Sequence, residues 1–159
     1  MGCRAAGAIA AGLYTGVSSS GYTMWLVLIV EDDPQMRDFF GASIKRSGDL
    51  ALAGSVGTVA EAIAWLDDPA HAVDVVLTDL GLPDGSGLDV IRHATQLHPA
   101  CEPLVISMFG DEDNVLASIE AGALGYIHKD STPEDIAHAI REMKAGASPI
   151  SPMIARRVL

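Results

Sequence analysis

Short apolar runs that alternate with amphipathic segments constrain the fold of this 159-residue chain more than any other feature. Residues 26–30, with the sequence LVLIV, form the first run. Uninterrupted apolar runs of this length are typical of strands buried on both faces of a parallel sheet. Residues 34–46 follow with apolar side chains at helical spacing, and Asp33 with Pro34 suits a helix start. A strand followed by a helix therefore opens the pattern.

The same strand and helix pair recurs four more times. Strands are predicted over 50–56, 73–77, 104–106 and 124–127, and helices over 58–66, 88–97, 111–121 and 132–144. Thr58 and Glu61 form a capping box, and Gly122 suits the end of a helix. Five strands that alternate with five helices predict an α/β domain with a doubly wound parallel sheet. Right-handed crossovers then place helices on both faces of that sheet.

The charge of the chain argues against one class of partner. It carries 21 acidic and 10 basic side chains, for a formal net charge of −11. The phosphate backbone of a nucleic acid would repel such a chain, so direct nucleic-acid binding by these residues is not expected. No apolar run reaches the roughly 18 residues that a membrane span needs. An acidic balance also suits a site where carboxylates surround a cation.

The two ends of the chain differ from its middle in composition. Residues 1–23 join a weak Ala- and Gly-rich run to a Ser cluster, which favours a disordered extension or an upstream choice of start site. Residues 146–159 contain the Ser- and Pro-rich stretch 148–152 and two arginines, which is typical of a linker. The folded domain is therefore predicted over residues 24–145.

Polar side chains gather where the predicted strands end. In chain order they are Glu31, Asp32 and Asp33, then Asp79, then Ser107, and then Tyr126 and Lys129. Ligands of an open parallel sheet bind outside the carboxyl ends of its strands, so three aspartates, a hydroxyl and a lysine are expected to converge. Converging carboxylates raise one another's pKa, and a hard divalent cation relieves that cost. Mg²⁺ is favoured because it uses one or two carboxylates, keeps waters and coordinates phosphate oxygens.

These residue types suit phosphoryl transfer. Asp79 is left as a carboxylate nucleophile of the kind that forms aspartyl-phosphates. Lys129 supplies positive charge for the phosphoryl oxygens or for the Asp79 carboxylate, and the Ser107 hydroxyl can donate to a phosphoryl oxygen. Phosphoryl transfer needs mainly positioning and charge neutralisation, and this set provides both.

At these residues the chain resembles the receiver domain of two-component response regulators. The matching segments are 30–34 (VEDDP), 78–87 (TDLGLPDGSG), 106–107 (IS) and 122–130 (GALGYIHKD), in the order and with the spacing of the family. The resemblance covers residues 25–145. Segment 122–130 and the tail from Ser148 also resemble the NarL/FixJ (LuxR-type) class, in which a helix-turn-helix DNA-binding domain follows such a linker.

The resemblance implies a flavodoxin-like (βα)5 fold with strand order 2-1-3-4-5. It implies that Asp79 is the phosphoacceptor and also a metal ligand. The other implied Mg²⁺ ligands are Asp33 directly, Asp32 largely through water, and the backbone carbonyl of Gly81. Gly81 lacks the side chain that many relatives carry there, which leaves the lifetime of the phosphorylated state open.

For the remaining residues the resemblance implies a signalling switch. Lys129 and Ser107 would stabilise the phosphoryl group, and Ser107 with Tyr126 would change conformation in response. The chain would not be an enzyme. Its partners would be a sensor histidine kinase or phosphotransfer protein and, once phosphorylated, a second copy of itself. The implied location is cytoplasmic, and the implied output is transcription through a DNA-binding domain outside this sequence.

Three other functions stay open. A pseudo-receiver would use the same fold for interactions alone, although the complete acid, hydroxyl and lysine set argues against it. A flavodoxin-like nucleotide or flavin binder needs backbone donors after the first strand, where this chain has residues 31–33 (EDD). A hydrolase that forms an aspartyl-phosphate would need a cap over its substrate, and no insertion is large enough. Among single residues, Asp33 also suits plain helix capping and Tyr126 plain packing.

Overall fold

The computed structural model describes residues 24–108 and 110–158, so the expectation for residues 1–23 lies outside the described residues. In chain order the elements are β1 Trp25–Val30, α2 Pro34–Arg46, β2 Leu50–Val56, α3 Val59–Asp67, β3 Val75–Thr78, β4 Gly81–Leu82, β5 Gly85–Ser86, α4 Gly87–Leu97, β6 Glu102–Ser107, α5 Glu112–Ala121, β7 Gly125–His128, α6 Pro133–Lys144 and α7 Pro152–Val158. Within this described part, no helix is both long and apolar enough to cross a membrane.

Five parallel strands form the central sheet in the order β2-β1-β3-β6-β7. When only the five strands of this sheet are numbered, their order is 2-1-3-4-5. The predicted fold class is therefore confirmed. The two short strands β4 and β5 pair antiparallel in the loop after β3, which the sequence predicted as a turn. The hairpin lies next to the carboxyl end of β3, and it therefore helps to shape the loop that follows Asp79.

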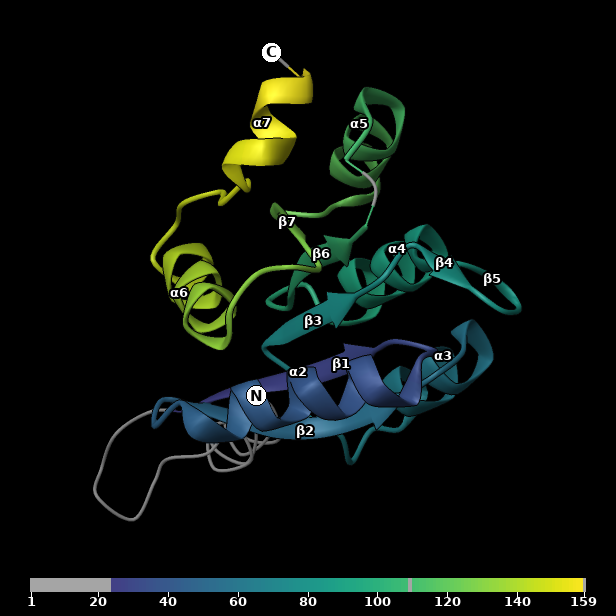
Figure 1. Ribbon diagram of the computed structural model, residues 1–159. Coiled ribbons are helices and arrows are strands. Elements are labelled where there is room, and N and C mark those ends of the chain that lie inside the picture. The colour runs from purple at the N-terminus through teal and green to yellow at the C-terminus, as the bar shows by residue number, and fades with distance from the viewer. Residues whose placement is uncertain (1–23, 109, 159) are drawn as a thin grey trace.

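Helices cover both faces of the sheet (Figure 1). The helices α2 and α6 pack on one face, and α3, α4 and α5 pack on the other. Strand β1 serves both layers, because Val27 and Ile29 join the first cluster while Leu28 and Val30 join the second. All four side chains are fully buried, which explains the uninterrupted apolar run in the sequence.

Local signals place the helices as the sequence predicts. The Thr58 side chain caps α3 by accepting a hydrogen bond from the Glu61 amide. The Asp111 side chain caps α5 by accepting one from the Asn114 amide. Gly122 ends α5 with a φ of 119°, a left-handed conformation that glycine adopts without steric cost. Parallel pairing of the strands brings their carboxyl ends to one edge of the sheet.

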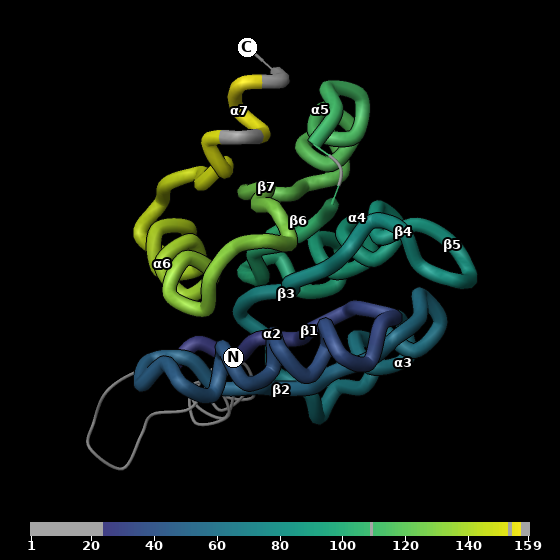
Figure 2. Tube along the Cα trace, viewed as in Figure 1, coloured from purple at the N-terminus to yellow at the C-terminus, as the bar shows by residue number. Residues whose placement is uncertain are grey.

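The C-terminal segment differs from the expected linker (Figure 2). Ile150 pairs in parallel with Tyr126 of β7, and α7 then packs against α5 and β7. Ile154 of α7 is only 1% exposed, so the segment is part of the packed unit. A short helix seated by tertiary contacts gives little sequence signal, because its stability comes from packing. That this segment leads to a further domain stays a prediction.

Candidate functional site

The site is built from the residues that follow four neighbouring strands. Glu31 and Asp32 follow β1, Asp79 follows β3, Ser107 ends β6 and Lys129 follows β7. Backbone hydrogen bonds continue the sheet into these positions. The amide of Asp79 donates to the carbonyl of Val30 at 3.0 Å. The amide of Lys129 donates to the carbonyl of Ser107, also at 3.0 Å. The sheet therefore fixes the side chains at its carboxyl edge.

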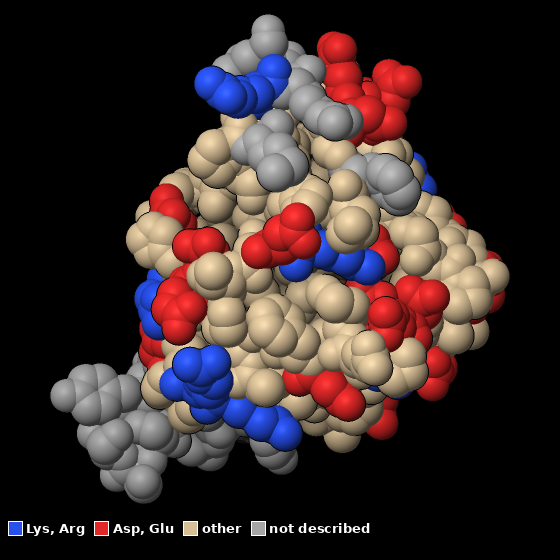
Figure 3. Space-filling view, in the orientation of Figure 1, with Lys and Arg blue, Asp and Glu red and all other residues tan. Residues whose placement is uncertain are grey.

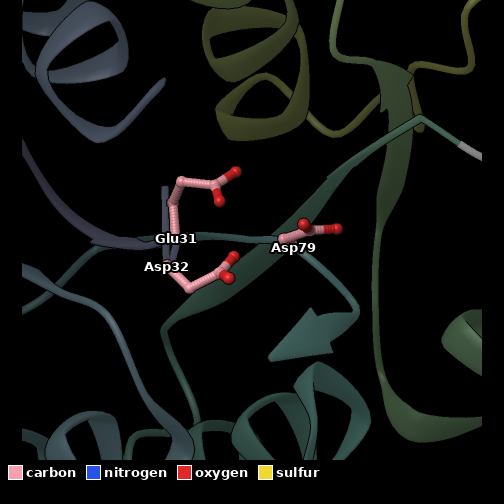
Figure 4. Close-up of side chains that lie close together, drawn as sticks. All are labelled: Glu31, Asp32 and Asp79. Carbon is pink, nitrogen blue, oxygen red and sulfur yellow. The ribbon is translucent and has the colours of Figure 1, made fainter. Parts of the chain in front are cut away.

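Three carboxylates meet at this edge (Figure 4). Glu31, Asp32 and Asp79 each offer an oxygen, and these oxygens lie within 4.8 Å of one another. Glu31 and Asp79 are buried, whereas Asp32 is exposed. An oxygen-only cluster that is partly open to solvent is the donor set that hard divalent cations bind. The residues present therefore fit a metal site of the kind that the sequence predicts.

Asp33 does not belong to this cluster, contrary to the sequence prediction. Its carboxylate accepts a hydrogen bond from the Gln35 amide at 2.9 Å and so caps α2. Glu31, which the prediction left out, takes the buried place instead. The carboxylate of Glu31 also accepts from the Asp33 amide at 3.0 Å. The acidic pair is thus one residue earlier than predicted, and the position of Asp33 before Pro34 was the signal for its capping role.

Lys129 neutralises part of this negative charge. Its ammonium lies 2.6 Å from Oε1 of Glu31 and 2.7 Å from Oδ2 of Asp79. Burial raises the pKa of Glu31, and Lys129 opposes that shift. Burial alone would lower the pKa of Lys129, but the contacts with Asp79 and Glu31 outweigh it, and the pKa is raised. Lys129 therefore stays charged at neutral pH and holds the two acids together.

Arg37 is a second cation near the site, and the sequence prediction did not single it out. Its Nη1 donates to the backbone carbonyl of Glu31 at 2.8 Å and to that of Asp32 at 3.4 Å. These bonds hold the backbone of the acidic loop. Because they go to carbonyl oxygens, Arg37 does not occupy the carboxylates of Glu31 and Asp32. Arg37 lies on α2 six residues after Glu31, and a long basic side chain at that spacing is the signal that could have indicated this role.

A cleft of about 400 Å³ opens beside Asp79. Its lining includes Gly81, Ser107 and Lys129, so these three predicted site residues share one space with Asp79. Gly87 begins α4 so close to Asp79 that a Cβ there would overlap the Asp79 carbonyl oxygen. The turn predicted from the Gly and Pro residues thus brings α4 directly against the acceptor candidate. The cleft is large enough for a phosphoryl group and its waters.

Ser107, which lines the cleft, contacts Tyr126. Both are buried, at 2% exposure each, and the hydroxyl of Tyr126 hydrogen bonds with the Ser107 side chain. Burial raises the pKa of Tyr126, an effect that this hydrogen bond opposes. Tyr126 therefore stays a neutral phenol at physiological pH. The two residues proposed as a switch are in contact, with Tyr126 in an inward position.

Comparisons with known proteins agree with this geometry. A family model of the response regulator receiver domain matches residues 27–141. The DNA-binding transcriptional activator DevR/DosR of Mycobacterium tuberculosis is 32% identical over 77% of this chain and 55% of its own length. The nitrate/nitrite response regulator NarL of Escherichia coli is 27% identical over 79% of this chain and 57% of its own. The chain thus spans little more than half the length of these two relatives.

A solved structure is similar over most of the chain. It is a LuxR-family two-component response regulator from Aurantimonas sp., with 29% sequence identity and a TM-score of 0.77. The match covers 86% of this chain and 96% of that one. The isolated receiver domain of RcsB from Salmonella enterica, solved with phosphomimetic BeF3⁻, has a TM-score of 0.77 at 20% identity, which supports the fold alone.

Proposed function

Because the chain belongs to the response-regulator receiver domain family, and its relatives include NarL- and LuxR-type regulators, we propose that Asp79 accepts a phosphoryl group from a phosphohistidine. The observation that carries the proposal is the position of Lys129. Its ammonium contacts the Asp79 carboxylate at 2.7 Å beside a cleft that Ser107 also lines. A nucleophile, a fixed positive charge and a hydroxyl donor thus share one space.

The transfer step follows from this arrangement. The amide of Leu80 donates to Oδ1 of Asp79 at 2.7 Å, which fixes the plane of the carboxylate. A carboxylate oxygen attacks phosphorus, the bond from phosphorus to the histidine nitrogen breaks, and the imidazole keeps the electron pair and takes up a proton. Lys129 then faces the added negative charge, and Ser107 donates to a phosphoryl oxygen.

In this proposal Asp32, Asp79 and the backbone carbonyl of Gly81 would hold Mg²⁺, with Glu31 in the same acidic cluster as the two aspartates. When bound, Mg²⁺ neutralises charge on the phosphoryl oxygens. Asp33 is left out because its carboxylate caps α2. The support is the chemistry of the oxygen donors, which includes the buried carboxylate of Glu31.

The response to phosphorylation is carried by Ser107 and Tyr126. A phosphoryl oxygen at Asp79 attracts the Ser107 hydroxyl, and Tyr126 follows because its hydroxyl already bonds with Ser107. A charge-assisted hydrogen bond of this type contributes roughly 1.5–3 kcal/mol. That energy shifts a balance between two states by about tenfold to a hundredfold, which is enough to regulate.

The role in the cell is that of a switch and not of an enzyme. The chain acts in the cytoplasm, where a sensor histidine kinase or a phosphotransfer protein donates the phosphoryl group. The phosphorylated chain then forms a homodimer or releases an output. DevR/DosR is named as a DNA-binding transcriptional activator, and for this chain we propose transcription as the output, through residues outside the present sequence.

The proposal is tested with acetyl phosphate and Mg²⁺ as phosphodonor and cofactor, followed by mass spectrometry. The parent protein gains one phosphoryl mass that hydroxylamine removes, whereas Asp79→Asn gains none. Asp38→Asn, an exposed substitution on α2, is the matched control and retains the modification. An Asp79→Asn protein that still gains the hydroxylamine-sensitive mass would place the acceptor elsewhere.

The same assay separates the neighbouring acids when Mg²⁺ is limiting. Asp32→Ala lowers the yield because it removes a ligand from the cluster. Asp33→Asn retains the yield because asparagine still caps α2. Equal losses in the two variants would contradict the metal site proposed here.

A further inference from the structure

The C-terminal strap, which we define as residues 147–158, extends the sheet beyond β7. The amide of Tyr126 donates to the carbonyl of Pro149 at 2.9 Å, and the amide of Ser151 donates to the carbonyl of Tyr126 at 3.1 Å. The hydroxyl oxygen of Ser151 also accepts from the amide of His128 at 3.0 Å. The strap is therefore bonded along the outer side of β7, with Tyr126 at the centre of the contact.

Two glycines permit this close docking. A Cβ on Gly125 would lie 2.9 Å from the carbonyl oxygen of Pro149, and one on Gly110 would lie 2.6 Å from a side-chain carbon of Ile154. Real side chains essentially never approach so closely, so larger residues at either position would displace the strap. The sequence of the domain is thus fitted to the strap at two separate points.

Ile154 anchors the strap in the same apolar cluster that holds Tyr126. The cluster also contains Val115 of α5, and Ile154 is 1% exposed within it. If Tyr126 swung outward, it would leave a void in the cluster that it shares with Ile154, and such voids are costly in a packed core. A seated strap therefore favours the inward position of Tyr126.

We propose that the C-terminal strap is a conformational relay, which docks on β7 and α5 cooperatively with phosphorylation of Asp79. This rests on the proposed function of Asp79. The phosphoryl group favours inward Tyr126 through Ser107, and the strap favours the same position through Ile154. Since both act on one two-state side chain, each strengthens the other by the same factor.

The coupling between the strap and Asp79 has a definite sign. A strap that docks more firmly after phosphorylation transmits the state of Asp79 to α7, more than one strand away from the site. It also means that seating the strap raises the affinity of the site for the phosphoryl group. A strap that blocked signalling would have the opposite sign, because its removal would then strengthen binding at Asp79.

The test uses beryllofluoride with Mg²⁺, which stands in for the phosphoryl group on Asp79, and the whole chain. The apparent affinity for beryllofluoride is measured from NMR amide shifts in the parent, in Ile154→Asp and in Arg156→Ala. Arg156 is exposed on α7, so Arg156→Ala is the control. Ile154→Asp is expected to weaken beryllofluoride binding about fivefold or more, at the low end of usual coupling between sites. Arg156→Ala is expected to bind like the parent.

A second readout follows the strap itself. Hydrogen exchange at the amides of His128 and Ser151, which bond across the contact, should slow in the parent when beryllofluoride is added. Ser151→Ala, a milder variant that removes only the Oγ acceptor, should show a smaller loss of affinity than Ile154→Asp. It keeps the test informative if the charged substitution disturbs the fold.

The outcomes distinguish a failure of the relay from a failure of Asp79 as phosphoacceptor. If beryllofluoride binds the parent and both strap variants equally, the relay is wrong and the phosphoacceptor stands. Tighter binding in Ile154→Asp would also overturn the relay, because the coupling would have the opposite sign. If the parent itself binds no beryllofluoride, the proposed function of Asp79 fails and the relay fails with it.

Discussion

Gly87 determines how closely α4 approaches the acceptor candidate. We predict that Gly87→Ala destabilises the protein by roughly 1–3 kcal/mol, the usual cost of overpacking, because the new Cβ would overlap the carbonyl oxygen of Asp79. Gly81→Ala is the matched control in the same loop, since a Cβ there meets nothing within 4 Å. Urea unfolding of the two variants measures the difference, and equal stabilities would show that α4 can shift freely.

At the residue scale, the sequence predicted which side chains converge at the sheet edge, apart from Asp33, and that exception has a physical origin. The positions of Asp79, Ser107 and Lys129 follow from strand ends, which parallel pairing brings to one edge. Three consecutive acids after β1 are harder to interpret, because the turn decides which of them point inward. Asp33 turns away to cap α2, and Glu31 takes the buried position. Arg37 was missed because its partners are backbone carbonyls.

At the element scale, Asp84 joins the loop after β3 to helix α3. Its two carboxylate oxygens accept from the amides of Val59 at 2.8 Å and Ala60 at 3.0 Å. These amides, Ala60 first, lower the pKa of Asp84 from 3.8, so the folded state favours the ionised form. Asp84 therefore contributes stability that is present above the unfolded pKa and is lost as pH falls through the lower folded value.

We predict that Asp84→Ala lowers the free energy of unfolding near neutral pH and speeds hydrogen exchange at the first turn of α3. The deficit relative to the parent should shrink as the pH is lowered from about 6 to about 3, where the parent carboxylate also becomes protonated. Asp38→Ala, exposed on α2, is the control substitution. A deficit that stays constant over this range would mean that ionisation of Asp84 contributes nothing.

Among the elements, those with strong local signals were predicted within a few residues. The helix over 34–46 and the strand over 50–56 match α2 and β2 in the structure. The two elements that were missed lack such signals. The β4–β5 hairpin has only two residues in each strand. Helix α7 is short, and the buried side chain of Ile154 packs it against the domain. Their stability comes from tertiary contacts that one segment of sequence does not reveal.

At the scale of the whole molecule, the net charge of −11 limits the partners of these residues. On the face in Figure 3, acidic and basic side chains of the described residues are interspersed. We predict that the chain gives no sequence-specific shift of duplex DNA in gels, because nucleic-acid binding needs a concentration of positive charge. Binding that persists at physiological salt and depends on the DNA sequence would contradict this, and unrelated DNA of equal length is the control.

The topology itself was predictable because few arrangements satisfy an alternation of strands and helices with right-handed crossovers. Strand β1 lies inside the sheet, and its side chains alternate between two apolar layers. What the pattern did not indicate was the extent of the packed unit. The segment after residue 146 contains a Ser- and Pro-rich stretch typical of a linker, yet it pairs with β7.

The backbone bonds between the C-terminal strap and β7 have a consequence for how the chain behaves in concentrated solution. An outermost strand with unpaired amides is a template for strands of other molecules and a starting point for aggregation. In this chain the outward amides of Tyr126 and His128 are already bonded, to Pro149 and Ser151. A protein shortened before Pro149 would leave both of them open. The last residues thus protect solubility in addition to any part in signalling.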